Sequence, residues 1–406
     1  MPRLLCALIS LLCAGCAFSR TQSETASGRT LALVEQVPHY GTRTREPMVV
    51  QHPTGTLFVA GYAVSTQAVW KSQDLGKTWA PVAFGTNAAG LMGNSDTDLA
   101  VAADGTLYFA SMTFDRATSE GRQIAVAVSR DAGSTWTWSA VSKGRFDDRP
   151  WLKVASDGTV QLIWNDGSGV QHRISRDRAA TWITMPRISD RGGSSHLAIG
   201  PQGQIAVRVA PVSASGNRYD PDVDMIRVST DAGATWQTRP VPGYPTWSAT
   251  DLSRWVEPLA WDARGVLFAA WTEKTAVWLG RSTDQGATWA TWQIAGGTAD
   301  AYYPFLVAQK DGEIAVTWHA GKGDALRWYA ARVTLPSDAK APRSRISDAQ
   351  ELDAFYWPAD KPAVAPIRSS AGEYLAAIFL RDGGLGVVTP VQSKQRDGFT
   401  WWRFEQ

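Results

Sequence analysis

Charged and aromatic side chains recur at one point of a repeated pattern, just before an apolar β-strand begins. Arginine binds carboxylates through paired hydrogen bonds, whereas acidic and phenolic groups serve as acids, bases and nucleophiles. If these strand starts converge in space, their side chains form a site for a polar or anionic ligand; otherwise they are ordinary solvated strand ends. The residues concerned are Arg45, Glu46, Asp96, Asp98, Asp148, Arg149, His196, Arg254, Glu257, Tyr302, Tyr303, Tyr356 and Trp357.

A second repeat has the pattern Ser-x-Asp-x-Gly-x-Thr-Trp. A short acidic side chain can accept backbone N–H bonds across a tight turn, glycine can take φ > 0, and tryptophan buries a large area. The repeat therefore predicts a structural turn, because a catalytic motif is rarely repeated in one chain. It is intact at 72–79, 129–136, 229–236 and 282–289, has Ala179 in place of glycine at 175–182, and is degenerate at 393–402; its acids are Asp74, Asp131, Asp177, Asp231 and Asp284.

Between these turns, an apolar strand, a glycine turn and a second apolar strand recur. The turn glycines are Gly55, Gly105, Gly158, Gly203, Gly265, Gly312 and Gly372, with a mean spacing of (372 − 55)/6, about 53 residues. Four short strands in such a period are typical of a propeller blade. The sequence predicts an all-β chain with a single β-propeller over residues 31–406. Seven four-stranded blades are favoured, and six blades with one end unit serving as closure are the alternative.

The Ser-x-Asp-x-Gly-x-Thr-Trp repeat resembles the Asp-box, or bacterial neuraminidase (BNR) repeat, of sialidase-like β-propellers. The resemblance covers essentially the whole mature chain. It implies that each box lies in the turn between the third and fourth strands of a blade, away from the active site. It also implies an exo-α-sialidase-like glycoside hydrolase, with an arginine triad for the substrate carboxylate, a tyrosine nucleophile activated by a glutamate, and an acid/base aspartate.

Part of that catalytic set can be matched. The stretch "TREP" (44–47) resembles the motif that carries one arginine, which implies Arg45, although Glu46 departs from the motif. Segments 256–267 and 302–316 resemble those with the glutamate and the tyrosine. No arginine stands in "AAWTEK" (269–274), and no acid precedes the box aspartate in 61–74. The resemblance therefore implies Tyr303 and Glu257 as catalytic candidates and Arg45 as a substrate contact. Asp98 is taken as the acid from the next blade, and the strand-start position adds Arg149, Arg254, Tyr302 and Trp357 as substrate contacts.

Three functions stay open at this point. One is an exported glycoside hydrolase that acts on glycans with an incomplete sialidase set. The alternative is a non-catalytic propeller lipoprotein that binds a glycan or a protein at the cell envelope. A purely structural role in the envelope is a third.

The first sixteen residues predict an export signal of the lipoprotein type. Arg3 precedes an apolar run (4–14) that is too short to span a bilayer. The stretch "CAGC" (13–16) resembles a bacterial lipobox, which implies lipidation of Cys16; an ordinary secretory signal cut near Ala17 is the alternative. Residues 17–30 are polar and small, as in a flexible tether. The expected location is the bacterial outer membrane or periplasm, or else the medium.

Composition excludes several partners. With 40 basic and 38 acidic residues and no basic run, nothing favours nucleic acid. All three cysteines lie in the signal segment, so the mature chain has no disulfide and no cysteine metal site, and the five histidines show no metal-binding spacing. We expect a monomer without metal or cofactor, a glycan or other polar ligand at the channel mouth, and membrane contact only through the lipid.

Overall fold

The fold is known from a computed structural model. Cys16, Arg254 and Trp357 lie outside the residues that it describes, so their roles stay predictions, as do export and lipidation. The described residues are 26–27, 31–42, 44–63, 65–84, 90–211, 223–243, 256–310, 312–321, 326–335, 345–346, 350–352, 372–392 and 397–405. None of these segments forms a helix with the length and hydropathy needed to cross a bilayer.

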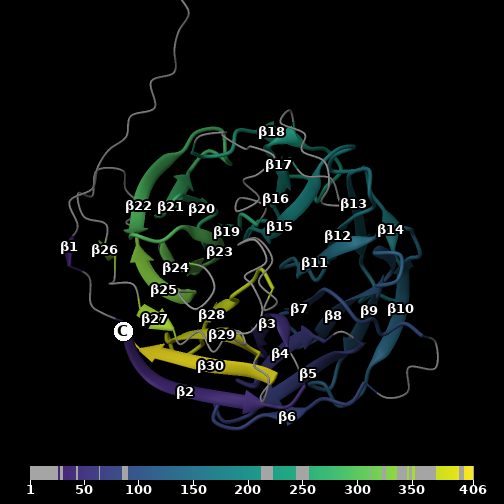
Figure 1. The fold of residues 1–406 in the computed structure, drawn as a ribbon. Helices are drawn as coiled ribbons and strands as arrows, with labels where there is room; N and C mark the ends of the chain where they lie inside the picture. Colours follow the sequence, from purple (N-terminus) through teal and green to yellow (C-terminus); the bar gives the residue numbers. More distant parts are fainter. Residues whose placement is uncertain are drawn as a thin grey trace, which may run out of the picture.

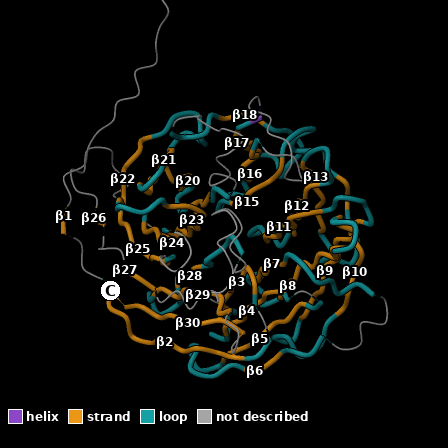
Figure 2. The backbone as a smooth tube through the Cα atoms, viewed as in Figure 1, coloured by secondary structure: helices purple, strands orange, loops and turns teal. Residues whose placement is uncertain are grey.

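Seven sheets, antiparallel except for one two-residue parallel pair at the edge of the sixth, stand around a central axis like the blades of a propeller (Figure 1). The described residues form strands joined by turns and loops, without an α-helix (Figure 2). The prediction of an all-β, seven-bladed propeller is therefore confirmed, and the six-bladed alternative is wrong.

Blades 1 to 3 follow the chain, with the innermost strand first. Blade 1 contains β3 (Arg45–Gln51), β4 (Leu57–Tyr62), β5 (Gln67–Ser72) and β6 (Ala80–Pro81). Blade 2 contains β7 (Thr97–Val101), β8 (Leu107–Asp115), β9 (Glu120–Ser129) and β10 (Thr137–Ser142). Blade 3 contains β11 (Asp148–Val154), β12 (Val160–Asn165), β13 (Val170–Ser175) and β14 (Ile183–Thr184).

Blades 4 to 6 continue in the same order. Blade 4 contains β15 (Gly193–Ile199), β16 (Ile205–Ala210), β17 (Met225–Ser229) and β18 (Gln237–Arg239). Blade 5 contains β19 (Leu259–Trp261), β20 (Leu267–Glu273), β21 (Ala276–Ser282) and β22 (Ala290–Gly296). Blade 6 contains β23 (Ala301–Ala308), β24 (Glu313–Ala320) and β25 (Arg327–Thr334), which pairs with both β26 (Arg345–Ile346) and β27 (Gln350–Leu352). Within the expected tether, β1 (Ala26–Ser27) pairs in parallel with β26.

Blade 7 joins the two ends of the chain. Its strands are β28 (Ala377–Phe379), β29 (Leu385–Gln392) and β30 (Asp397–Glu405), and its outermost strand is β2 (Ala32–Tyr40), which comes from the N-terminal side. The antiparallel register of β2 and β30 runs from Ala32 opposite Glu405 to Tyr40 opposite Gly398. In Figure 1 these two strands lie side by side. The ring is thus closed by backbone hydrogen bonds and not by side-chain packing alone.

The hairpin expected around Gly372 lies elsewhere. The first hairpin of blade 7 turns at Leu380–Gly384, where Gly383 has φ 89°, whereas Gly372 precedes β28. The expected degenerate box at 393–402 is also misplaced, because it falls between the second and third strands of its blade. Both errors have one cause: the fourth strand of blade 7 is β2, so the seventh unit is permuted relative to the other six.

The five remaining Ser-x-Asp turns join the third strand of a blade to the fourth. In blade 2, Asp131 Oδ1 accepts hydrogen bonds from Ser129 Oγ at 2.8 Å and from Thr135 N at 2.8 Å, and its Oδ2 accepts one from Thr135 Oγ1 at 2.6 Å. The bonds from the Thr135 hydroxyl and amide lower the pKa of Asp131 to about 2. Ala132 and Gly133 follow with φ of 52° and 81°, the left-handed pair that a tight hairpin turn requires.

Each turn glycine sits against the preceding blade. A side chain at Gly76 would collide with Trp401 of blade 7, one at Gly133 with Phe58 of blade 1, and one at Gly233 with His172 of blade 3. In blade 3, where Ala179 replaces glycine, Trp182 Nε1 donates to Ser139 Oγ of blade 2 at 3.1 Å. The turns therefore hold neighbouring blades together as well as closing their own hairpins.

Substitution Asp131→Ala is expected to lower Tm by a few degrees, because the turn loses all the acceptors of that carboxylate. Asp157→Ala is the matched control, since Asp157 lies in a turn of the next blade and its side chain accepts one bond, from Thr159 N at 2.8 Å. Thermal unfolding followed by circular dichroism measures both variants. Equal Tm values for the two would contradict the role assigned to the Ser-x-Asp turns.

Candidate functional site

The innermost strands of blades 1, 3 and 6 begin with the same distortion. In each, the register shifts over the first residues and a proline follows a residue with positive φ: Glu46 (46°), Arg149 (52°) and Tyr303 (50°). A residue before proline normally adopts extended backbone, and left-handed φ costs about 1 kcal/mol or more for a residue with a side chain. Strain of this kind is typical of functional sites, because it turns a side chain in a direction that a regular strand would not allow.

These strand starts gather a mixed group of acids, arginines and tyrosines. We call it the axial cluster and define it as Arg45, Glu46, Tyr62, Asp96, Asp148, Arg149, Tyr303, Glu373 and Tyr374. The residues come from blades 1, 2, 3 and 6 and from the segment that leads into blade 7. Their charges influence one another across the ring, as the pKa shifts described below show.

Glu46 is a buried acid, 7% exposed. Among the residues that the structure describes, none forms a hydrogen bond or ion pair with its carboxyl group. Its side chain packs against Gly372, where an added Cβ would lie 2.1 Å from Glu46 Cγ. An unpaired ionised carboxylate in such a place is costly, so the carboxyl is expected to be neutral.

Arg149 is held by two neighbours from the far side of the ring. Its Nη1 donates to Tyr374 Oη at 2.8 Å and its Nη2 donates to Glu373 Oε2 at 2.6 Å. Its Nε also lies 4.0 Å from Asp148 Oδ2. The side chain of Arg149 is 8% exposed, against 20% for Glu373 and 25% for Asp148. The carboxylates are therefore the more accessible part of this network.

The acids of the cluster differ in protonation. Burial raises the pKa of Glu46 well above its ordinary value, and the carboxylates of Asp96 and Glu373 raise it further. Burial and the carboxylate of Asp96 raise the pKa of Asp148 to about 7. These shifts favour the protonated form of Glu46, and near pH 7 they divide Asp148 between its two forms.

Tyr303 lies deep in an aromatic wall. It is fully buried, and its ring centroid lies 5.2 Å from Tyr302 and 5.6 Å from His319. Burial and the nearby carboxylate of Glu373 raise the pKa of the Tyr303 phenol well above its ordinary value. Tyr302 Oη donates to the carbonyl of Gly321 at 2.8 Å, which fixes the neighbouring ring.

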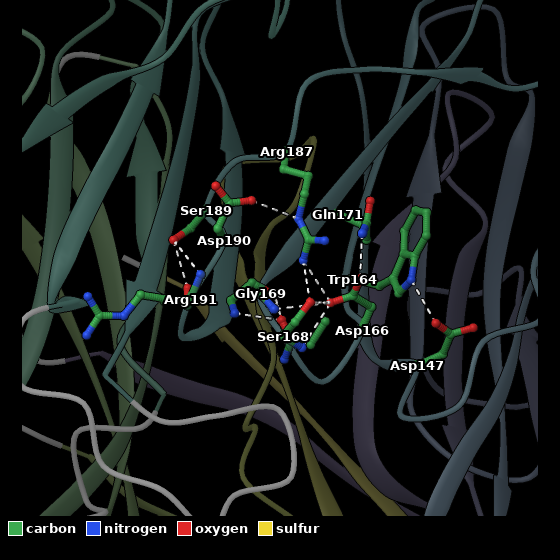
Figure 3. A network of polar contacts seen from close by, with 12 residues as sticks. Asp147, Trp164, Asp166, Ser168, Gly169, Gln171, Arg187, Ser189, Asp190 and Arg191 are labelled. Carbon is green, nitrogen blue, oxygen red and sulfur yellow. Dashed lines mark hydrogen bonds and ion pairs between the residues drawn. The ribbon is translucent and has the colours of Figure 1, made fainter.

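A polar network stiffens the rim next to Asp148 (Figure 3). Asp147 Oδ1 accepts a bond from Trp164 Nε1 at 3.0 Å, and Oδ2 accepts one from Gly144 N at 2.8 Å. In the following hairpin, Asp166 accepts bonds from Gln171 Nε2 at 2.6 Å and from Arg187 Nη2 at 2.9 Å (Figure 3). The β12–β13 turn and the strand start that carries Asp148 are therefore braced from both sides.

Two predicted catalytic residues already have partners from other blades. Asp98 Oδ2 accepts hydrogen bonds from Leu152 N at 2.8 Å and Lys153 Nζ at 2.9 Å, which tie blade 2 to blade 3. Glu257 Oε2 accepts bonds from Arg208 Nε at 3.0 Å and Nη2 at 2.7 Å. Arg208 also contacts Asp224, and it is 1% exposed, so this is a buried ion triad. The structure thus brings Arg45, Arg149 and Tyr303 into the axial cluster and engages Asp98 and Glu257 in structural pairs.

Arg45 lies over the ring of Tyr62, with its guanidinium carbon 5.3 Å from the ring centroid.

No group of three or more His, Cys, Asp or Glu side chains within the described part of the chain has the geometry to hold a metal ion. The cluster contains acids, arginines and tyrosines, which are the groups that acid–base and hydrogen-bonding chemistry uses.

Six members of the cluster are given no role from the sequence. Tyr62, Glu373 and Tyr374 are not among the predicted strand-start residues, whereas Glu46, Asp96 and Asp148 are among them without an assigned role. A signal for Glu46 was present, because Glu46-Pro47, Arg149-Pro150 and Tyr303-Pro304 occupy the same position in three units. Glu373 and Tyr374 could not be found in this way, since their unit was assigned a hairpin turn at Gly372.

No family model matches the sequence, and no curated protein matches it. Among solved structures, YCF48 from Cyanidioschyzon merolae is 14% identical, with 92% of this chain and 99% of that chain covered and a TM-score of 0.55. A protein of unknown function from Dyadobacter fermentans DSM 18053 is 16% identical, with 93% and 99% covered and a TM-score of 0.51. The α-L-arabinanase of Penicillium chrysogenum, complexed with arabinobiose, is 17% identical, with 93% and 98% covered and a TM-score of 0.49.

At these identities the likeness concerns the fold alone. The chain has the seven-bladed β-propeller fold that its repeats predict, and the likeness to YCF48 supports that fold. Of the predicted site residues, Arg45, Arg149 and Tyr303 lie in the axial cluster, whereas Asp98 and Glu257 pair with Lys153 and Arg208.

Substitution Gly372→Ala is expected to destabilise the protein more than Gly55→Ala. Both glycines have positive φ (96° and 92°), but nothing lies within 4 Å of a Cβ at Gly55, whereas a Cβ at Gly372 collides with Glu46. The control should lose about 1 kcal/mol from backbone strain, and Gly372→Ala about 1–3 kcal/mol more from overpacking. Urea unfolding measures the difference; equal losses would contradict the close packing of Gly372 on Glu46.

Proposed function

We propose that the protein is a glycoside hydrolase that acts on a glycan bound at the axial cluster. The observation that carries this proposal is Glu46: a strained, buried carboxyl group to which no described residue donates a hydrogen bond, with a pKa raised well above its ordinary value by burial and by neighbouring acids. Glycosidic bonds are cleaved in most such enzymes by a pair of carboxyl groups, one of which has a raised pKa and serves as the general acid.

In this proposal Glu46 donates its proton to the glycosidic oxygen as the bond between that oxygen and the anomeric carbon breaks. A water molecule supplies the oxygen that bonds to the anomeric carbon, and its proton passes to the ionised form of Asp148. The carboxylates of Asp96 and Glu373 stabilise the positive charge that develops on the sugar ring. Atoms and charge balance, since one proton leaves Glu46 and one reaches Asp148.

The other predicted residues take supporting roles. Arg149, fixed by Glu373 and Tyr374, sets the position of both acids that it touches. Tyr303 is assigned to the buried aromatic wall and not to the role of nucleophile. Its raised pKa disfavours the phenolate that a nucleophile requires. Asp98 and Glu257 hold blades together through Lys153 and Arg208.

The second candidate is a binding propeller without catalysis. It is favoured because two predicted catalytic acids form ion pairs with other blades, Asp98 with Lys153 and Glu257 with Arg208. Acids held in this way are not available for catalysis. A structure of YCF48 bound to D1 peptide, 11% identical with a TM-score of 0.53, has the same fold. In this second proposal the axial cluster binds its ligand and leaves it intact.

The wild-type protein is expected to release the aryl group from at least one of a panel of aryl glycosides of pentoses, hexoses and sialic acid. Glu46→Gln should lower kcat by about 10²- to 10⁴-fold, because the amide cannot supply the proton. Glu405→Gln, an exposed acid near the C-terminus, is the matched control and should retain wild-type activity. Initial rates of chromophore release measure all three proteins.

Two results separate the candidates. Wild-type inactivity on the whole panel, with a glycan or peptide still bound, would reject the hydrolase and favour the binding propeller. Full activity of Glu46→Gln would reject Glu46 as the acid.

The activity should depend on pH through the two raised pKa values. The rate is expected to increase as pH rises through about 7, where Asp148 ionises, and to fall at higher pH, where Glu46 loses its proton. Asp148→Asn should lower the rate and remove the dependence on the acidic side. The profile of kcat/KM between pH 4 and 10 measures this, and an unchanged acidic limb in Asp148→Asn would contradict the assignment of Asp148 as base.

A further inference from the structure

We propose that the axial cluster selects uncharged sugars over sialic acids, uronic acids and other anionic ligands. The inference rests on the proposed function as far as it takes the ligand to be a glycan. It departs from the sialidase resemblance, which implies an arginine triad that binds the carboxylate of an anionic sugar.

The first step concerns the arginines. A substrate carboxylate needs a guanidinium whose paired donors are available. Arg149 directs two of its nitrogens to Tyr374 and Glu373 and is 8% exposed. Arg208 contacts Glu257 and Asp224 and is 1% exposed. Both cations are thus already paired with the chain's own carboxylates, which occupy the place that the substrate's carboxylate would take.

The second step concerns the charges that remain accessible. The side chains of Asp148 and Glu373 are 25% and 20% exposed, and Asp96 is half-buried. Of these three acids, Glu373 is paired with Arg149. Asp96 and Asp148 therefore stand against one half-buried arginine of the described part of the cluster, Arg45, which lies over Tyr62 and beside Glu46. A further anion brought to this surface would meet like charge in a partly desolvated place, which disfavours its binding.

The third step concerns what the cluster does accommodate. Carboxylates accept hydrogen bonds and do not donate them, and sugar hydroxyl groups are donors. Neighbouring hydroxyl groups of one ring can donate to the two oxygens of one carboxylate. Acidic side chains over buried aromatic rings therefore suit a neutral, polyhydroxylated ring. The same surface rejects an anion by repulsion, which is how specificity between similar ligands is commonly obtained.

The test uses probe pairs that differ in a single group. An aryl glucoside and the aryl glucuronide differ by a hydroxymethyl group against a carboxylate, as do an aryl galactoside and the galacturonide. Calorimetric titration and a glycan array of neutral, uronic-acid and sialylated oligosaccharides measure binding by the wild-type protein without relying on catalysis. We expect at least tenfold tighter binding of the neutral members.

A variant tests the physical cause. Glu373→Gln removes one accessible carboxylate and its charge-assisted bond to Arg149, so binding of acidic probes should improve by about tenfold relative to neutral ones. Asp104→Asn is the matched control, because Asp104 pairs with Arg178 in a turn at the other end of blade 2. A circular dichroism spectrum identifies a misfolded variant, in which case Asp148→Asn takes the place of Glu373→Gln with the same expectation.

The outcomes separate the inference from the proposed function. Equal or tighter binding of acidic probes by the wild-type protein overturns the selection of neutral sugars and leaves a glycoside hydrolase intact. Binding of neutral probes without hydrolysis supports the selection and rejects the hydrolase. Neither binding nor hydrolysis of any glycan overturns both. An unchanged preference in Glu373→Gln and Asp148→Asn overturns the electrostatic cause.

Discussion

The pairing of β2 with β30 is the interaction on which the rest of the architecture depends. Blades 1 to 5 complete their sheets from consecutive residues, and blade 6 adds only the two-residue β1, but blade 7 needs a full strand from the opposite end of the chain. Closing the ring costs the conformational entropy of bringing the two ends together, and the main-chain bonds of two nine-residue strands offset it. Only a closed ring directs all the inner strand starts towards one axis, so the candidate site exists because the termini meet.

The axial cluster combines three costs that a stable protein ordinarily avoids: left-handed backbone before proline, a buried acid without a partner among the described residues, and several carboxylates close together. Glu46, Arg149 and Tyr303 each have left-handed backbone before a proline. Glu46 is also the buried acid, and the carboxylates of Asp96 and Glu373 repel its ionised form. Such conflicts persist where the surrounding structure imposes them, and here the seven packed blades do so. Their concentration in one place is the physical reason to look for chemistry there.

The sequence was informative where one physical cause is repeated. The turn pattern and the period of about 53 residues recur because every blade meets the same packing problem, and they predicted the propeller and its seven blades. The pairing of β2 with β30 does not recur, so the seventh unit was read in the wrong frame, with a hairpin at Gly372 and a box at 393–402.

The candidate site could be predicted only in part. The strand starts were recognised, and Arg45, Arg149 and Tyr303 do lie in the cluster. Whether an acid is available depends on its partners, and those come from distant blades: Lys153 for Asp98 and Arg208 for Glu257. Glu46 was set aside because it departs from a family motif, whereas its burial and its lack of partners among the described residues become visible only in three dimensions.

The docking of each Ser-x-Asp turn on the preceding blade gives the ring a direction. Each such blade carries a Ser-x-Asp turn that packs against the preceding blade. Its opposite border receives the turn of the blade that follows. A gene segment encoding one blade could therefore be copied in tandem, and the added unit would attach to its neighbour without new contacts having to arise. Blades 6 and 7 are the exceptions: blade 6 lacks the Ser-x-Asp sequence and extends its sheet with β26, β27 and β1, and blade 7 takes its fourth strand, β2, from the other end of the chain. The borders between blades 5 and 6 and between blades 6 and 7 are therefore where this head-to-tail mode of growth is interrupted.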